Sequence, residues 1–218
     1  SAPPGKEKLC WFRDYLKTQV AKAKVKVRLG TEITTPLVQK ENPDVVIIAT
    51  GAKPLRPKSF AKDIPTAWDV LGGKVAITNK RVIRVGGGMV GVETAEYLVH
   101  QGNCVTVVEM LPKLAADMEM HNRFGALQAL KEAGATMLPN KEVVKVTKKG
   151  VATVDKESGK EAFIDGEVVI VAVGAAPQRD LADALEEKVS ELYTVGDCNE
   201  PRIIMEAVYE GSRVARRI

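Results

Sequence analysis

A glycine-rich turn between a strand pattern and a helix pattern constrains the fold of this chain more than any other feature. The turn reads Gly86-x-Gly88-x-x-Gly91, follows the apolar stretch Arg81–Val85 and opens the helical stretch Met89–Gln101. Gly86 allows a tight turn, Gly88 lets the backbone approach a pyrophosphate, and Gly91 lets the helix pack closely against the strand. Unpaired N–H groups at the start of a helix attract anions. The predicted phosphate-binding loop comprises Gly86, Gly87, Gly88, Met89, Val90 and Gly91.

The next strand pattern, Cys104–Glu109, ends in an acid 23 residues after Gly86. A carboxylate at this place accepts hydrogen bonds from the ribose hydroxyls of a bound adenosine and repels a 2′-phosphate. The spacing therefore predicts that Glu109 selects NAD(H) over NADP(H). Lys113, four residues further on, would reduce the preference for NAD(H) if it reached the ribose. We expect it instead to be a solvated side chain.

The chain carries an internal repeat. Asp44–Pro54 (DVVIIATGAKP) and Glu167–Pro177 (EVVIVAVGAAP) are identical at seven of eleven positions, at an offset of 123 residues. Each copy is a buried-strand pattern that ends in a turn of small residues, with Gly51 and Gly174 at equivalent places where a backbone could approach a ligand. The repeat predicts two related dinucleotide domains, although no glycine loop precedes the first copy.

The remaining pattern alternates helix with strand, which predicts an α/β fold. Three short strands within residues 141–165, with a Ser158-Gly159 turn, predict a small antiparallel meander. Arg84 is unusual in an apolar strand, and we expect it to mark an edge or a loosely covered tip of the sheet. Helices are expected at 7–23, 89–101, 117–133 and from about 203, and strands at 25–29, 44–49, 81–85, 104–109, 167–173 and 192–195. The expected core faces of two of these helices are Leu9, Phe12, Leu16 and Val20, and Met120, Phe124, Leu127 and Leu130.

Composition excludes several classes of protein. The 218 residues are 45% hydrophobic and 28% charged, which is ordinary for a globular protein and argues against wholesale disorder. The net charge of +4 is spread among acids and aromatics are only 5%, so a nucleic-acid groove is not expected. Apolar runs such as Val45–Ala49 are too short to span a membrane.

Cysteine and histidine usage gives no sign of a metal or nucleophilic centre. Cys10, Cys104 and Cys198 form no CxxC pair and have no metal-ligand spacing, and their sparse use fits a reducing cytoplasm. No signal-peptide pattern opens the sequence at Ser1. His100 and His121 have no partner at metal spacing, and no Ser–His–Asp or GxSxG pattern occurs. We therefore assign no catalytic side chain and no metal ligand.

Six motifs follow one another along the chain. They are PPGKEK (Pro3–Lys8), ATGAKP (Ala49–Pro54), GGGMVGVETAEYL (Gly86–Leu98), VTVVEM (Val105–Met110), AVGAAP (Ala172–Pro177) and YTVGDC (Tyr193–Cys198). In this order they resemble the motifs of flavoproteins with two dinucleotide-binding domains. The most similar subgroup is the C-terminal half of the NADH:flavin oxidoreductases that include 2-enoate reductase, 2,4-dienoyl-CoA reductase and trimethylamine dehydrogenase.

The resemblance implies a Rossmann-like NAD(H) domain at residues 75–177, including the meander and forming three layers. Residues 1–74 and 178–218 would form an incomplete FAD-type domain that lacks its own phosphate loop. Thr50 and Gly51 would lie in the turn near the flavin nucleotide. Gly196 and Asp197 would form a motif whose carboxylate binds the ribitol of FAD, a role that suits an acceptor of sugar hydroxyls.

The resemblance also implies a function: NADH binds at the glycine loop, reduces FAD, and electrons pass on to an enoate-type site outside this chain. FMN and an iron–sulfur cluster would belong to an N-terminal barrel that this sequence does not contain. The isolated chain is expected to hold FAD weakly or not at all, and its open sheet edges would favour pairing into a homodimer. One alternative is a non-catalytic module that binds ADP, as in proteins like trimethylamine dehydrogenase. Another is a stand-alone NADH:acceptor reductase, which the absent flavin loop argues against.

Overall fold

The computed structural model describes residues 5–218, so Pro3 and Pro4 of the PPGKEK motif lie outside the described residues. The chain packs as two compact units. The first unit contains residues 5–23 and 54–174 of the described chain, and the second contains residues 24–53 and 175–218. The family resemblance implies domain divisions at 74/75 and 177/178, and that assignment of nucleotide domains stays a prediction. Residues 54–74 belong with the first unit because Phe60 and Val70 lie in its cores.

A four-stranded parallel sheet forms the centre of the first unit. Its order is β5-β4-β3-β9, so that β3 and β4 have a neighbour on each side. Both faces of these two strands are covered, which explains why they read as continuous apolar runs. The strands are β3 (Arg81–Val85), β4 (Cys104–Val108), β5 (Thr136–Leu138) and β9 (Val168–Val171).

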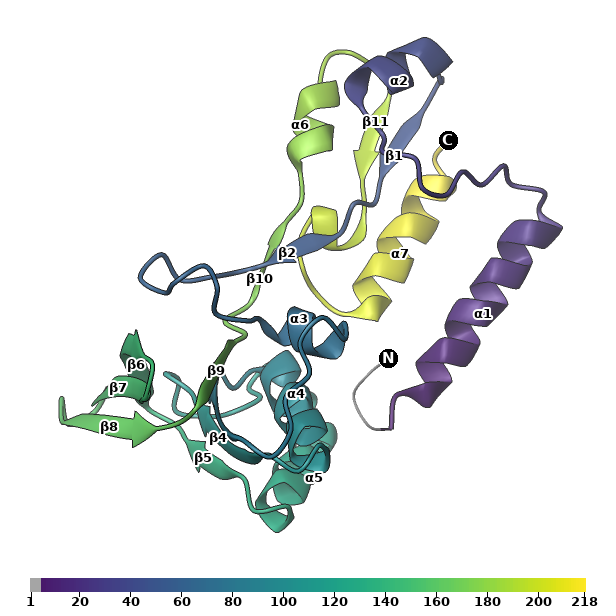
Figure 1. Ribbon diagram of the computed structural model, residues 1–218. Helices are drawn as coiled ribbons and strands as arrows, with labels where there is room; N and C mark the ends of the chain where they lie inside the picture. The colour runs from purple at the N-terminus through teal and green to yellow at the C-terminus, as the bar shows by residue number, and fades with distance from the viewer. Residues whose placement is uncertain (1–4) are drawn as a thin grey trace. The chain divides into compact units, whose positions relative to one another are not determined.

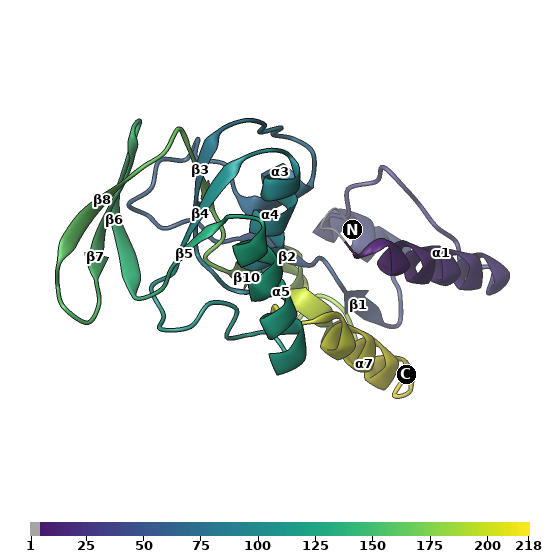
Figure 2. The same ribbon diagram turned by 90° about the horizontal axis from the view of Figure 1, so that it is seen from below.

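Helices cover one face of this sheet (Figures 1 and 2). Val82 of β3 and Val107 of β4 pack into a core with Val92, Leu98 and Leu130 from the helices. Helix α4 ends where Gly102 adopts a left-handed conformation (φ +79°), as the sequence predicts. The helices on this face are α3 (Ala67–Leu71), α4 (Met89–His100) and α5 (Met120–Glu132).

The predicted antiparallel meander covers the opposite face (Figure 2). Ile83 and Val85, which alternate with Val82 along β3, pack there with Val151 of the meander. The first unit is therefore a three-layer arrangement, as expected. The meander strands are β6 (Lys141–Thr147), β7 (Gly150–Asp155) and β8 (Glu161–Asp165), in the order β6-β7-β8.

The second unit is smaller. Its strands β1 and β11 pair in parallel, and Val38, Ile48, Leu185 and Cys198 form its core. A short 3₁₀ helix, η1, follows β11 and leads through a loop to α7. The elements are α2 (Thr35–Glu41), β1 (Val46–Ile48), β2 (Ala52–Pro54), β10 (Ala175–Pro177), α6 (Asp180–Leu185), β11 (Leu192–Thr194), η1 (Gly196–Cys198) and α7 (Ile204–Ala215).

The two copies of the sequence repeat have the same local structure. Each strand, β1 or β9, ends in a turn whose glycine has positive φ, +75° at Gly51 and +109° at Gly174. A short strand follows each turn, and these two strands, β2 and β10, pair with each other. Only glycine adopts such φ values without strain, so the shared glycines have a structural reason.

Three expectations from the sequence are wrong. Residues 25–29 form no strand and are largely exposed, because no described strand pairs with them. Helix α1 (Glu7–Lys22) forms, but its expected core face is about 40–45% exposed. Helix α5 begins at Met120, and Phe124 is exposed while Leu130 is buried. Helical periodicity identifies the helix, but burial depends on which neighbours the fold supplies.

Candidate functional site

The glycine loop joins the end of β3 to the start of α4 in the first unit. Gly86 has a φ of +97°, and a Cβ there would lie 2.3 Å from the carbonyl oxygen of Ala172, the residue after β9. A Cβ on Gly91 would lie 2.4 Å from the carbonyl oxygen of Gly86. Both positions therefore require glycine to let backbone segments approach each other closely. The atoms nearest to a Cβ on Gly88 would be those of the Asp117 carboxylate, at 3.2 Å.

Glu109 follows β4 and is buried against this loop, with 7% of its surface exposed. Its carboxylate accepts hydrogen bonds from the N–H of Gly87 at 2.5 Å and from the N–H of Leu111 at 2.7 Å. The sequence predicts the position of this acid beside the loop but not these two bonds. Each carboxylate oxygen has a second lone pair, so Glu109 can still accept a bond from a ribose hydroxyl. Lys113 is exposed.

Arg84 lies beneath the loop, in the central strand β3. The expected sheet edge at this residue is wrong, because β3 pairs on both sides and Arg84 is fully buried. Its Nη1 donates to the carbonyl of Val85 at 2.7 Å, but Nε and Nη2 have no hydrogen-bond partner among the described residues. Burial lowers the pKa of Arg84 to about 9, and the charge of Glu109 partly opposes that shift.

Asp117 also lies at this candidate site, although the sequence does not predict it. Its carboxylate accepts a hydrogen bond from the N–H of Met89, the first residue of α4, at 2.8 Å. It precedes α5, whose N-terminus is capped instead by the side chain of Glu119. No spacing rule points to Asp117, because its contact with Met89 is set by the path of the loop after β4.

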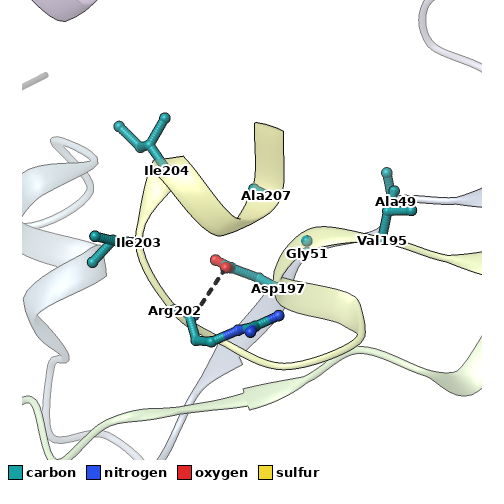
Figure 3. A pocket seen from close by; sticks show the side chains of 9 residues that line it. Ala49, Gly51, Val195, Asp197, Arg202, Ile203, Ile204 and Ala207 are labelled. Carbon is teal, nitrogen blue, oxygen red and sulfur yellow. Dashed lines mark hydrogen bonds between the residues drawn. The ribbon is translucent and has the colours of Figure 1, made fainter. Parts of the chain in front are cut away.

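The second unit has its own candidate site, a cavity of about 320 Å³ (Figure 3). Asp197 of η1 accepts a hydrogen bond from the N–H of Arg202 at 3.3 Å. Gly196 has a φ of +67°. The residues that line the cavity are Ala49, Gly51, Val195, Gly196, Asp197, Arg202, Ile203, Ile204 and Ala207.

Glu210 of α7 organises one side of this cavity. It accepts a hydrogen bond from the N–H of Gly196 at 2.7 Å and forms an ion pair with Arg202. Burial alone would raise the pKa of Glu210, but the bonds from Gly196, Asn199 and Arg202 hold it below its ordinary value. Glu210 therefore holds the Gly196-Asp197 turn in place through the backbone of Gly196. The carboxylate of Asp197 lies on the cavity side of this turn.

The structure brings the predicted residues together in two groups. The loop Gly86–Gly91 and Glu109 lie side by side in the first unit. Gly51, Gly196 and Asp197 line one cavity in the second unit, whereas Thr50 lies beside it and donates from its hydroxyl to the carbonyl of Gln178 at 2.6 Å. Gly174 belongs to neither group; its carbonyl accepts a bond from the N–H of Leu55.

Neither a cluster of metal ligands nor a membrane-spanning helix is found among the described residues. None of its His, Cys, Asp and Glu residues gather in threes in a way that could hold a metal ion. None of its helices is both long and apolar enough to cross a bilayer.

Comparison with known proteins gives a consistent match. Residues 12–211 match the family model for pyridine nucleotide-disulphide oxidoreductases. The chain is 40% identical to an NADH oxidase of Thermoanaerobacter brockii, over 100% of this chain and 34% of the relative. It is 34% identical to a bilirubin reductase of Mediterraneibacter gnavus, over 97% of this chain and 33% of the relative.

A solved structure of a 2-naphthoyl-CoA reductase complex has the same fold. It matches with a TM-score of 0.92 and 30% identity, over 100% of this chain and 33% of that protein. The chain thus spans about a third of the length of each of these three proteins.

Proposed function

The chain belongs to the pyridine nucleotide-disulphide oxidoreductase family, and we propose that its first unit binds NADH at the loop Gly86–Gly91. The family and its oxidoreductase members support NAD(P) and FAD binding in general. One observation carries the finer proposal: Glu109 lies buried against the glycine loop, within hydrogen-bond distance of the N–H of Gly87. A carboxylate fixed at this place favours a free 2′-hydroxyl over a 2′-phosphate.

The residues of the loop fit a pyrophosphate. The backbone packs closely at Gly86 and Gly91, and position 88 is a glycine, where a side chain would obstruct the approach of a ligand to the first turn of α4. The N–H groups of Gly88, Met89 and Val90 lie at the positive end of a 12-residue helix. These groups would hold the diphosphate while Glu109 holds the adenosine ribose.

In the second unit, the cavity would hold part of a flavin nucleotide. Asp197 would accept hydrogen bonds from sugar or ribitol hydroxyls, and the turns at Gly51 and Gly196 leave room for a close approach of the ligand. A bound nicotinamide and flavin would supply hydride transfer, and no side chain of this chain need act as an acid or base.

For the whole protein, we propose an electron-input role in an NADH:flavin oxidoreductase, in which electrons pass to an enoate-type acceptor at a site outside this chain. The similar proteins include a 2-naphthoyl-CoA reductase and a bilirubin reductase, which supports a reductive role for the whole protein. FMN and an iron–sulfur cluster would belong to that outside part.

A second candidate function is binding of ADP without catalysis. The loop and Glu109 would recognise only the ribose and diphosphate, which ADP shares with NADH. No contact described in the first unit distinguishes the two ligands.

Calorimetric titration of the purified chain with NADH, NADPH and ADP separates these functions. The NADH proposal expects NADH to bind more tightly than both NADPH and ADP. Equal affinity for NADH and NADPH would contradict the role of Glu109. Equal affinity for NADH and ADP, with no reduction of added FAD by NADH, would favour the ADP module. Absence of binding by all three ligands would refute both candidates.

A separate titration with FAD tests the second unit. Because this chain is expected to hold FAD at most weakly, the titration runs to high FAD concentration. There we expect partial quenching of flavin fluorescence that weakens when Asp197 is changed to Asn, because the amide accepts hydroxyl bonds less strongly than a carboxylate. Asp183→Asn, a change of charge on the exposed side of α6, serves as the matched control. Equal quenching in all three proteins would contradict the role of Asp197.

A further inference from the structure

One backbone N–H at the glycine loop is already hydrogen-bonded to an acidic side chain. The carboxylate of Asp117 accepts the N–H of Met89 at 2.8 Å and would contact a Cβ on Gly88 at 3.2 Å. Met89 opens α4, whose N-terminal N–H groups have no partner within the helix. Asp117 therefore lies where an anion gains most from the helix dipole and from a charge-assisted hydrogen bond.

The side chain of Asp117 can rotate away from the N–H of Met89 while the segment around it stays folded. Leu114 and Ala115 are buried in the core, and the N–H of Ala115 donates to the carbonyl of Gly87 at 2.6 Å. Arg123 also holds the segment, through a bond from its Nε to the carbonyl of Leu114 at 2.7 Å. Asp117 itself is exposed. Rotation of one solvent-facing side chain would free the N–H of Met89, while the backbone around it stays anchored.

A second observation indicates that this loop is suited to an anion. The guanidinium of Arg84 lies fully buried beneath the same turn, and its Nη2 would be 3.0 Å from a Cβ on Gly91. Nε and Nη2 find no acceptor among the described residues. A buried cation under the loop adds to the positive potential of the helix end. The only anion hydrogen-bonded to the described N-terminus of α4 is the carboxylate of Asp117.

We propose that Asp117 is an internal competitor for the phosphates of the nucleotide at the glycine loop, so that its carboxylate lowers the affinity for phosphate-bearing ligands. The inference rests on the proposed nucleotide site and adds a residue that sets its affinity. One N–H cannot donate fully to two anions, so a phosphate on Met89 must displace Asp117. The charge of Asp117 then also repels the bound phosphates.

The test compares Asp117→Asn with the parent chain in calorimetric titrations with ADP, AMP and adenosine. The neutral amide competes less well for the N–H of Met89 and repels no phosphate. We expect ADP to bind roughly 3–10-fold more tightly to the variant, AMP to gain less, and adenosine to gain nothing. Glu119→Gln is the matched control, because it removes a charge two residues away that caps α5 and does not contact the loop.

The outcomes separate this inference from the function on which it rests. If the parent chain binds ADP and Asp117→Asn binds it no more tightly, or only as much more tightly as Glu119→Gln, the competition is refuted and the nucleotide site stands. Weaker binding by Asp117→Asn would also refute it, because Asp117 would then be a ligand contact. If no form binds ADP or NADH, both proposals fail. The chemical shift of the Met89 amide in ¹⁵N-labelled protein checks that the variant is folded and that this N–H responds to ADP.

Discussion

The carboxylate of Glu109 and the backbone N–H of Gly87 are joined by a 2.5 Å hydrogen bond that ties the end of β4 to the glycine loop after β3. A second bond, from the N–H of Leu111 to the other oxygen, holds the start of the following segment. One buried side chain therefore fixes two loops at the carboxyl edge of the sheet, the edge at which ligands bind in open α/β folds.

Glu109→Gln should lower the stability of the chain and weaken the preference for NADH. The amide can accept from one of the two N–H groups, but its NH₂ group then faces the other donor. A buried donor without a partner costs about 1–3 kcal/mol. Urea unfolding measures the stability, and the ratio of the Kd values for NADPH and NADH measures the preference. Glu161→Gln, which changes an exposed acid of β8, is the control. An unchanged midpoint and an unchanged ratio would show that Glu109 has neither role.

Gly91→Ala and Gly125→Ala should change stability in opposite directions. A Cβ at position 91 would lie 2.4 Å from the carbonyl oxygen of Gly86, and the backbone must move to admit it. We expect a loss of roughly 2–3 kcal/mol, as for other overpacked sites. Gly125 lies in α5 with nothing within 4 Å of its added Cβ, so alanine should stabilise the helix by about 0.5–1 kcal/mol. Thermal unfolding of both variants measures this contrast, and a tolerated Gly91→Ala would contradict the close packing of α4 on the loop.

Arg84→Met should raise the stability of the chain. The substitution keeps an unbranched side chain of similar length and removes a fully buried cation with two unpaired nitrogens. Replacing buried charge by apolar groups often stabilises proteins by about 1–4 kcal/mol. The opposing effect is the loss of the charge that faces Glu109. Arg81→Met, at the exposed start of β3, is the control for removal of a positive charge. A lower urea midpoint for Arg84→Met would mean that the attraction between Arg84 and Glu109 outweighs the cost of burying the cation.

The local parts of the fold could be predicted from the sequence. Strands β3 and β4 form within a residue of their expected bounds because burial on both faces leaves an apolar run. Helix α4 ends as expected because Gly102 supplies a left-handed cap. The position of Glu109 beside the loop could also be predicted, because only one helix and one strand separate it from the glycine loop in the sequence.

Features that depend on distant neighbours could not be predicted. The stretch 25–29 has the residues of a strand, but a strand needs a hydrogen-bonding partner and no described strand pairs with it. Arg84 suggests an edge because cations are rarely buried, yet its strand is central. Asp117 and Met89 are 28 residues apart and meet only because the segment after β4 folds back over the glycine loop.

Asp155 makes part of the stability of the first unit dependent on pH. It ends β7 and accepts hydrogen bonds from Nζ of Lys141 at 2.5 Å and from the N–H and hydroxyl of Ser158. The side-chain bond from Lys141, followed by the bonds from Ser158, holds the pKa of Asp155 well below its ordinary value. A carboxyl whose pKa is lowered by folding stabilises the folded state at pH values above its unfolded pKa, about 3.9.

We therefore expect Asp155→Asn to be less stable than the parent chain at neutral pH, and the gap to shrink as the pH falls below about 4. Below that pH Asp155 is protonated in the unfolded chain but still ionised in the folded chain. The parent therefore loses free energy of unfolding as the pH falls, whereas the variant has no carboxyl at this position to titrate. Urea unfolding of both proteins between pH 3 and pH 7 measures the gap. Lys141→Met should reduce the pH dependence of the parent, because Lys141 supplies the strongest of these bonds. A gap that stays constant down to pH 3 would show that Asp155 is not stabilised as a carboxylate in the turn between β7 and β8.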